Sequence, residues 1–166
     1  MAVHRRRNGR FARNCVLEVD NFGGESVMMW GAISYAQNTQ LVHIPGNLSA
    51  ARYRDEVLTP HMLPVMNLRR EVVQHNNTPP NTSRATVDFL ANHSVTVLTW
   101  PSKYPALNPI EHFWDDLDRR VCSRQQAPQT LQELQHALEQ EWGRIPQERI
   151  RRLIEYMRRR VCAVLV

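Results

Sequence analysis

The segment "VVQHNNTPPNTSR", residues 72–84, is where an apolar run ends abruptly and polar, turn-forming residues begin. "EVVQH" predicts a short strand, and "NNTPP" predicts a loop, because proline cannot continue a ladder of main-chain hydrogen bonds. The first polar cluster after this strand is His75, Asn76 and Asn77, and it contains no carboxylate. In α/β folds the loops that follow strands project side chains into a shared crevice, so this cluster is a candidate site.

The rest of the chain alternates between strand and helix patterns before it becomes helical. Short apolar runs predict strands at 26–34, 40–44 and 94–100, the first two as a hairpin. Helices are predicted after the N-caps Ser49 and Thr82, in "NPIEHFWDDLDRRV", after the capping box of Thr130 and Glu133, and from Pro146 onward. The sequence therefore predicts an α/β body with a helical C-terminal part over residues 129–160.

Length and composition indicate one soluble globular domain. The chain has 166 residues, of which 42% are hydrophobic, enough for a real core. Its N-terminal segment has no apolar stretch typical of a signal peptide, and no apolar run approaches the roughly 20 residues that span a bilayer. The three cysteines are odd in number and widely spaced, which argues against a disulfide framework or a zinc site and favours a reducing compartment. We expect a nuclear or cytoplasmic protein that is neither secreted nor bound to a membrane.

Positive charge gathers at both ends of the chain. A basic arm over residues 1–14 carries five arginines and no acid, and residues 149–160 carry six arginines and one glutamate, so that each end has a net charge of +5. Because arginine binds phosphate bidentately, nucleic-acid binding at both ends is one interpretation, and a solvated basic surface is the other. The candidate residues for nucleic-acid binding are Arg5, Arg6, Arg7, Arg10, Arg13, Arg158, Arg159 and Arg160.

Glu111, in the first turn of the helix that begins within "NPIEHFW", is the second candidate site. A structural explanation is available, with Asn108 as N-cap, Pro109 as the first helical residue and Glu111 as the capping partner. Between Asn76 and Glu111 lie 34 residues.

This spacing and its flanking motifs resemble the catalytic domain of the Tc/mariner transposases. The similar segments span nearly the whole chain and include "VDNFGGESVMMWGAIS", "GNLSAARYRDEVLTPHMLP" and "WPSKYPALNPIEHFWDDLDRRV". The resemblance implies a ribonuclease H-like fold and a triad of two aspartates and one glutamate that cleaves and joins DNA with Mg²⁺ or Mn²⁺. In that comparison Glu111 is the third carboxylate, while Asn76 replaces the second aspartate.

The resemblance also implies what this chain lacks. The family's first aspartate lies on an opening strand upstream of "RRRNGRFARNC", so residues 1–166 would form a partial, truncated domain without the first, central strand of its sheet. Two divalent ions require carboxylates, and an asparagine oxygen cannot neutralise their charge. We therefore expect Asn76 to cripple the metal site and Glu111 to be a vestigial metal ligand.

Two functions are compatible with these features. The first is a transposase-derived protein with no strand cleavage or transfer activity of its own. The second is a non-enzymatic protein that binds nucleic acid, or that binds a full-length transposase or a second copy of itself through a sheet edge. A third, an active enzyme completed by another chain that carries the first aspartate, is disfavoured because Asn76 would remain.

Overall fold

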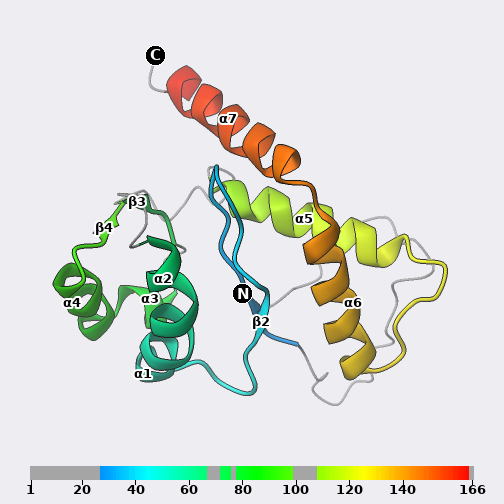
Figure 1. The fold of residues 1–166 in the computed structure, drawn as a ribbon, viewed down its shortest axis with the longest axis horizontal. Coiled ribbons are helices and arrows are strands. Elements are labelled where there is room, and N and C mark those ends of the chain that lie inside the picture. Colours follow the sequence, from blue (N-terminus) through cyan, green and yellow to red (C-terminus); the bar gives the residue numbers. More distant parts are fainter. Residues whose placement is uncertain (1–26, 67–71, 76–77, 99–107, 165–166) are drawn as a thin grey trace.

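The computed structural model describes residues 27–66, 72–75, 78–98 and 108–164, with side chains as far as Met157. Within these ranges the protein is mixed α/β and mostly helical, as Figure 1 shows. The sheet consists of two separate pieces of two strands each.

The first piece is the predicted hairpin. Strands β1 (Met29–Trp30) and β2 (Val42–His43) pair antiparallel, with Met29 opposite His43. A further hydrogen bond of 2.8 Å, from the Ile44 N–H to the Met28 carbonyl, extends the ladder. The hairpin turns after Ser34, whose hydroxyl oxygen accepts the main-chain N–H groups of Ala36 and Gln37.

The second piece pairs β3 (Val72–Val73) with β4 (Thr96–Val97) in parallel, so a crossover joins them. The crossover contains α3 (Pro79–Thr82) and α4 (Arg84–Asn92). The prediction of a loop at "NNTPP" is wrong for its prolines, because Pro79 and Pro80 open a helical turn, where a missing N–H costs nothing. The N-cap of α4 is Ser83, whose hydroxyl accepts from the Thr86 N–H, and not Thr82 as predicted.

The predicted helix after Ser49 is present but changes its winding along its length. Ser49 caps α1 (Ala50–Arg52) by accepting the Arg52 N–H at 3.2 Å. The helix then widens into the π-helix η1 (Tyr53–Met62) and continues as α2 (Leu63–Met66). Pro60 lies inside η1 and has no N–H to donate, so regular α-helical hydrogen bonding cannot continue through it.

Three longer helices form the C-terminal part: α5 (Pro109–Cys122), α6 (Leu131–Arg144) and α7 (Gln147–Val164). Thr130 caps α6 as predicted, since its hydroxyl accepts the Glu133 N–H at 3.1 Å. The Glu133 carboxylate reaches back to the Gln129 N–H at 2.7 Å, one residue beyond the predicted partner. None of the helices in the described ranges is long and apolar enough to cross a membrane.

Two hydrophobic clusters lie on opposite faces of the hairpin. Alternate strand residues, Val27, Met29 and Ile33, belong to a cluster with α5, α6 and α7. Their neighbours Met28 and Trp30 contact a second cluster built on η1, α2 and α4. This alternation is the period of two that a strand requires when both of its faces are covered. The hairpin therefore lies between two helical lobes, as Figure 1 shows.

Cys122, at the end of α5, is disulfide-bonded. The sequence argued against a disulfide framework and favoured a reducing compartment, and a disulfide at this one cysteine departs from that expectation.

Candidate active site

Glu111 is positioned by the start of α5. Asn108 has an extended backbone and caps the helix, its side-chain oxygen accepting the Ile110 N–H at 3.4 Å and its carbonyl accepting the Glu111 N–H at 3.1 Å. Pro109 follows as the first helical residue, as predicted. Among the described residues the Glu111 carboxyl group has no hydrogen-bond or ion-pair partner, so the predicted reciprocal bond to Asn108 does not form. Glu111 lines a cleft.

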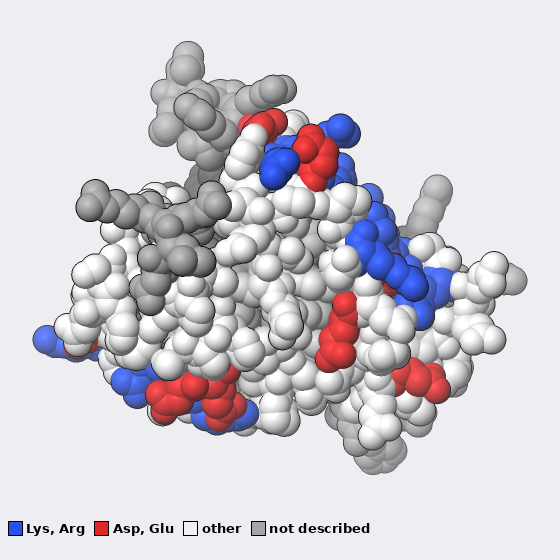
Figure 2. All heavy atoms as spheres, in the orientation of Figure 1, with Lys and Arg blue, Asp and Glu red and all other residues white. Residues whose placement is uncertain are grey.

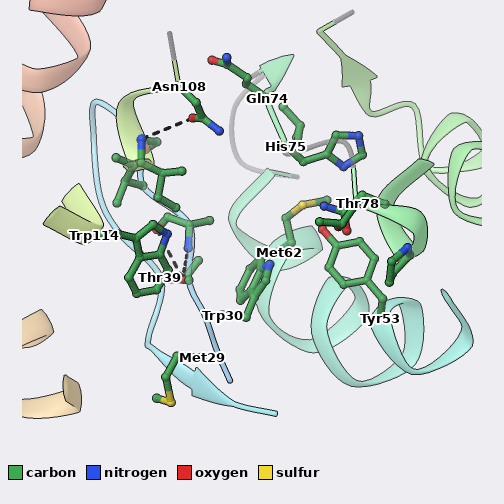
Figure 3. Close-up of a pocket in the computed structure, with 18 of the residues that line it drawn as sticks. Met29, Trp30, Thr39, Tyr53, Met62, Gln74, His75, Thr78, Asn108 and Trp114 are labelled. Carbon is green, nitrogen blue, oxygen red and sulfur yellow. Dashed lines mark hydrogen bonds between the residues drawn. The ribbon is translucent and has the colours of Figure 1, made fainter. Parts of the chain in front are cut away.

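The cleft separates the hairpin from the lobe that contains the second sheet. It has a volume of about 950 Å³, and β1, η1, β3, α3 and the start of α5 all contribute to its walls. Figure 3 shows Asn108, Gln74 and His75 at one end and Trp30, Met62 and Tyr53 further in. Among the described lining residues Glu111 is the single acid, and there is no lysine or arginine. The cleft is therefore nearly uncharged and largely apolar.

The Glu111 carboxyl group is held in an environment that disfavours its charge. Burial raises its pKa above the ordinary value, and the nearby carboxylate of Asp115 raises it further, while His112 acts in the opposite direction. Asp115 lies one helical turn after Glu111 and is exposed. No group of three or more His, Cys, Asp or Glu residues in the described part of the chain is arranged to hold a metal ion.

The segment that contains the second candidate position reaches the same cleft. Gln74 and His75 line it on one side of Asn76, and Thr78 lines it on the other. Asn76 itself, with Asn77, is outside the described residues. Burial lowers the pKa of His75, which favours the neutral imidazole. The structure thus brings the end of β3 and the start of α5 together, as the predicted crevice requires.

The side chains of the arginines proposed for nucleic-acid binding lie outside the described part of the structure. Arg5, Arg6, Arg7, Arg10 and Arg13 lie outside the described residues. Arg158, Arg159 and Arg160 belong to α7, but their side chains lie outside the described part.

The sequence indicated Asn108 only as a helix cap and did not reveal that its side-chain nitrogen is left without a partner among the described residues. Asn108 is 3% exposed, and its side-chain nitrogen is buried without a hydrogen-bond partner in the described part of the molecule. Its oxygen is occupied by the helix, so the amide donor lies on the side of the cleft (Figure 3). An Asn-Pro pair at a helix start signals a cap, and nothing in the sequence indicates that its amide donor is left over.

Solved structures with this arrangement of elements define the class. The catalytic domain of Mos1 transposase, solved with Raltegravir and Mg, matches with a TM-score of 0.65 at 19% identity, over 84% of this chain and 73% of that one. The Mos1 transposase paired-end complex with left transposon end matches with a TM-score of 0.71 at 18% identity, over 95% of this chain and 48% of that one. The fold is therefore ribonuclease H-like.

Sequence relatives identify the family. The model of the family described as DDE superfamily endonuclease matches residues 6–135. The Tcb1 transposase of Caenorhabditis briggsae is 34% identical over 98% of this chain, and the Tc1 transposase of Caenorhabditis elegans is 34% identical over 86%. The chain belongs to this family, as a Tc1/mariner-type transposase DDE catalytic domain. It spans 60% of the length of the first of these relatives and 52% of the second.

Proposed function

We propose that this chain is a transposase-derived domain that does not cleave or join DNA by itself. The observation that carries this proposal is the isolation of Glu111, the one acid among the described residues that line the cleft. The family reaction uses three carboxylates, and the sequence has an amide at Asn76 where the second belongs.

The described groups around Glu111 do not fit a pair of Mg²⁺ or Mn²⁺ ions. Gln74 and Asn108 offer neutral amides, and His75 offers an imidazole, whereas magnesium prefers carboxylate and water oxygens. We therefore assign no catalytic step to a metal ion in this chain.

The two pieces of the sheet are separated by the cleft. We infer that the cleft between β1 and β3 is where the family's opening strand, which carries the first aspartate, belongs. Two features support this placement: the sheet is divided into two pieces, and the cleft between them has apolar walls. Val72 of β3 is 56% exposed, although it is a β-branched residue in a strand.

A cleavage assay tests the loss of activity. Purified chain is incubated with supercoiled plasmid and with Mg²⁺ or Mn²⁺, in parallel with Glu111→Ala. We expect no nicking or joining above background in either protein, and the same result for Asn76→Asp, because one restored carboxylate still leaves the set incomplete. Nicking by the original chain that disappears in Glu111→Ala would refute the proposal.

The second candidate function is binding without catalysis. The arginine-rich ends favour DNA as the ligand, and the apolar cleft favours an extended polypeptide strand from a full-length transposase or from a second copy. Binding of DNA through about four phosphates predicts that log K falls with log salt with a slope of about −3.6. A response that does not depend on salt would exclude DNA as the ligand of the arginines.

A further inference from the structure

A partly buried carboxylate, that of Asp116, holds two arginines side by side where α5 meets α7. The Asp116 side chain is 12% exposed, and its two oxygens accept from Arg119 Nη2 at 2.6 Å and from Arg149 Nε at 2.7 Å. Arg119 lies one turn further along α5, while Arg149 is in the first turn of α7. The Arg119 and Arg149 side chains remain 71% and 47% exposed. Asp116 therefore orients two guanidinium groups whose outer parts face solvent.

Each of the two arginines keeps donors that its carboxylate partner does not use. Arg149 bonds through Nε, and Arg119 bonds through Nη2 and through Nε, which donates to the Asp115 carbonyl at 3.0 Å. Within the described part of the chain, both terminal nitrogens of Arg149 and the Nη1 of Arg119 remain available. A guanidinium group fixed at one edge in this way presents its other edge to an acceptor at little entropic cost.

A third arginine completes a hollow around this pair. Arg152, one turn after Arg149 on α7, lines a hollow of about 490 Å³ together with Arg119, Arg149 and His112. Its side chain is 72% exposed, and its contact with Glu148 is long, at 3.4 Å. Asp116 and Glu155 also line the hollow, so its three arginines and two acids sum to a net charge of +1.

The surroundings of the hollow add to its positive potential. Residues 147–164 of α7 contain six arginines and two glutamates, of which Arg149, Arg152 and Glu155 line the hollow itself. Figure 2 shows basic side chains gathered at the upper right, over the part of the molecule where α5, α6 and α7 meet. The net positive charge of α7 favours the approach of an anion to the hollow.

We propose that this hollow binds a phosphate of the DNA backbone, with Arg119, Arg149 and Arg152 as donors and Asp116 as the positioning residue. The choice of DNA rests on the proposed function, since DNA is the substrate of the family reaction. The hollow lies on a different side of α5 from the cleft, because His112 lines the hollow and the adjacent Glu111 lines the cleft. DNA is held here through its backbone, so binding is independent of base sequence.

The first test measures salt-dependent affinity for a short, fluorescein-labelled DNA duplex of random sequence, by anisotropy with the full chain. Arg152→Gln and Arg119→Gln should each weaken binding by about three- to tenfold and reduce the magnitude of the salt slope by about 0.9. Arg84→Gln is the control, because Arg84 is 95% exposed on α4 in the other lobe. Equal affinity and slope in the original chain, both hollow variants and the control would overturn the proposal.

The second test separates positioning from simple charge attraction. Asp116→Asn removes a negative charge, so attraction alone predicts tighter binding of DNA. Positioning predicts weaker binding, because Arg119 and Arg149 lose the group that holds them together. Tighter binding by Asp116→Asn would overturn the role of Asp116, and a melting curve for each variant establishes that it is folded.

The two proposals fail in different assays. Nicking that depends on Glu111 would refute the proposed loss of activity and leave the hollow unaffected. Affinity that does not respond to Arg119→Gln or Arg152→Gln would refute the hollow and leave the cleavage result unaffected.

Discussion

The indole N–H of Trp142 donates a hydrogen bond of 2.8 Å to the main-chain carbonyl of Thr39, which lies 103 residues earlier in the chain. The Trp142 ring also packs edge-on against Phe113, with ring centroids 4.7 Å apart. Trp142 is 3% exposed and Thr39 is 8% exposed. The bond joins α6 to the end of the hairpin turn and satisfies two polar groups that are both removed from water.

Replacing this indole should weaken the contact between the hairpin and the C-terminal helices. Trp142→Phe keeps an aromatic ring but leaves the Thr39 carbonyl unpaired and removes part of the buried ring. We expect a loss of about 1 to 3 kcal/mol in the free energy of unfolding. Urea denaturation followed by circular dichroism measures it, and an unchanged midpoint would show that the bond contributes nothing to stability.

Gly31 in the hairpin provides a second test of the same contact. A Cβ atom built on Gly31 would lie 2.5 Å and 2.7 Å from two atoms of the Trp142 ring. Because the ring is buried, Gly31→Ala should cost about 1 to 3 kcal/mol of stability. Gly143→Ala is the matched control: nothing lies within 4 Å of its Cβ, and alanine favours the helix by up to about 1 kcal/mol. The prediction fails if both substitutions shift the thermal midpoint in the same direction.

The Glu111 carboxyl group predicts an unusual dependence of stability on pH. Its pKa in the folded state is raised above the ordinary 4.5, first by burial and then by Asp115, so ionisation opposes folding. The destabilisation is fully present above the raised pKa and disappears as the pH falls below the unfolded value. Glu111→Gln should therefore raise the thermal midpoint at neutral pH and have little effect at pH below about 4. A stabilisation that is equal at both pH values would contradict this account.

Asp116 should show the opposite behaviour. Burial alone would raise its pKa, but the hydrogen bond and charge of Arg149 and the charge of Arg119 lower it below the ordinary 3.8. The ionised form is therefore favoured by folding, and its contribution is present above the unfolded pKa and lost as the pH falls through the folded value. Asp116→Asn should cost about 1 to 2 kcal/mol at pH 7, since its arginine partners are largely exposed. The difference from the original chain should shrink in melts at low pH.

Local signals in the sequence predicted most of the elements but not their exact ends. Ser49, Asn108 and Thr130 cap helices as predicted, because each precedes an apolar helical pattern. Thr82 and Ser83 both carry a hydroxyl group that could cap α4. Ser83 is the cap because Thr82 belongs to the helical turn that begins at Pro79, and the two prolines had indicated a loop there instead. The π-helical winding of η1 has no signal other than Pro60, a residue that more often ends a helix.

The site was predictable where it depends on position along the chain, and not where it depends on packing. Glu111 lies in the first turn of its helix and shares a cleft with the end of β3, as the crevice at strand ends implied. The apolar walls of the cleft are formed by segments far apart in sequence, and no single sequence pattern predicts them. The hollow at Asp116 was missed because "WDDLDRRV" has the usual appearance of an exposed helix, with acids placed one turn before bases.

The hairpin between the two lobes has a consequence for cooperativity. Met29 and Trp30 are neighbours in β1, yet each completes a different hydrophobic cluster. If either lobe opened alone, one full face of the hairpin would be exposed to water. The strands of the hairpin have only two residues each, so they would not be stable with that face exposed. The two lobes are thus thermodynamically linked, and their amide protons should exchange with solvent in a single concerted opening.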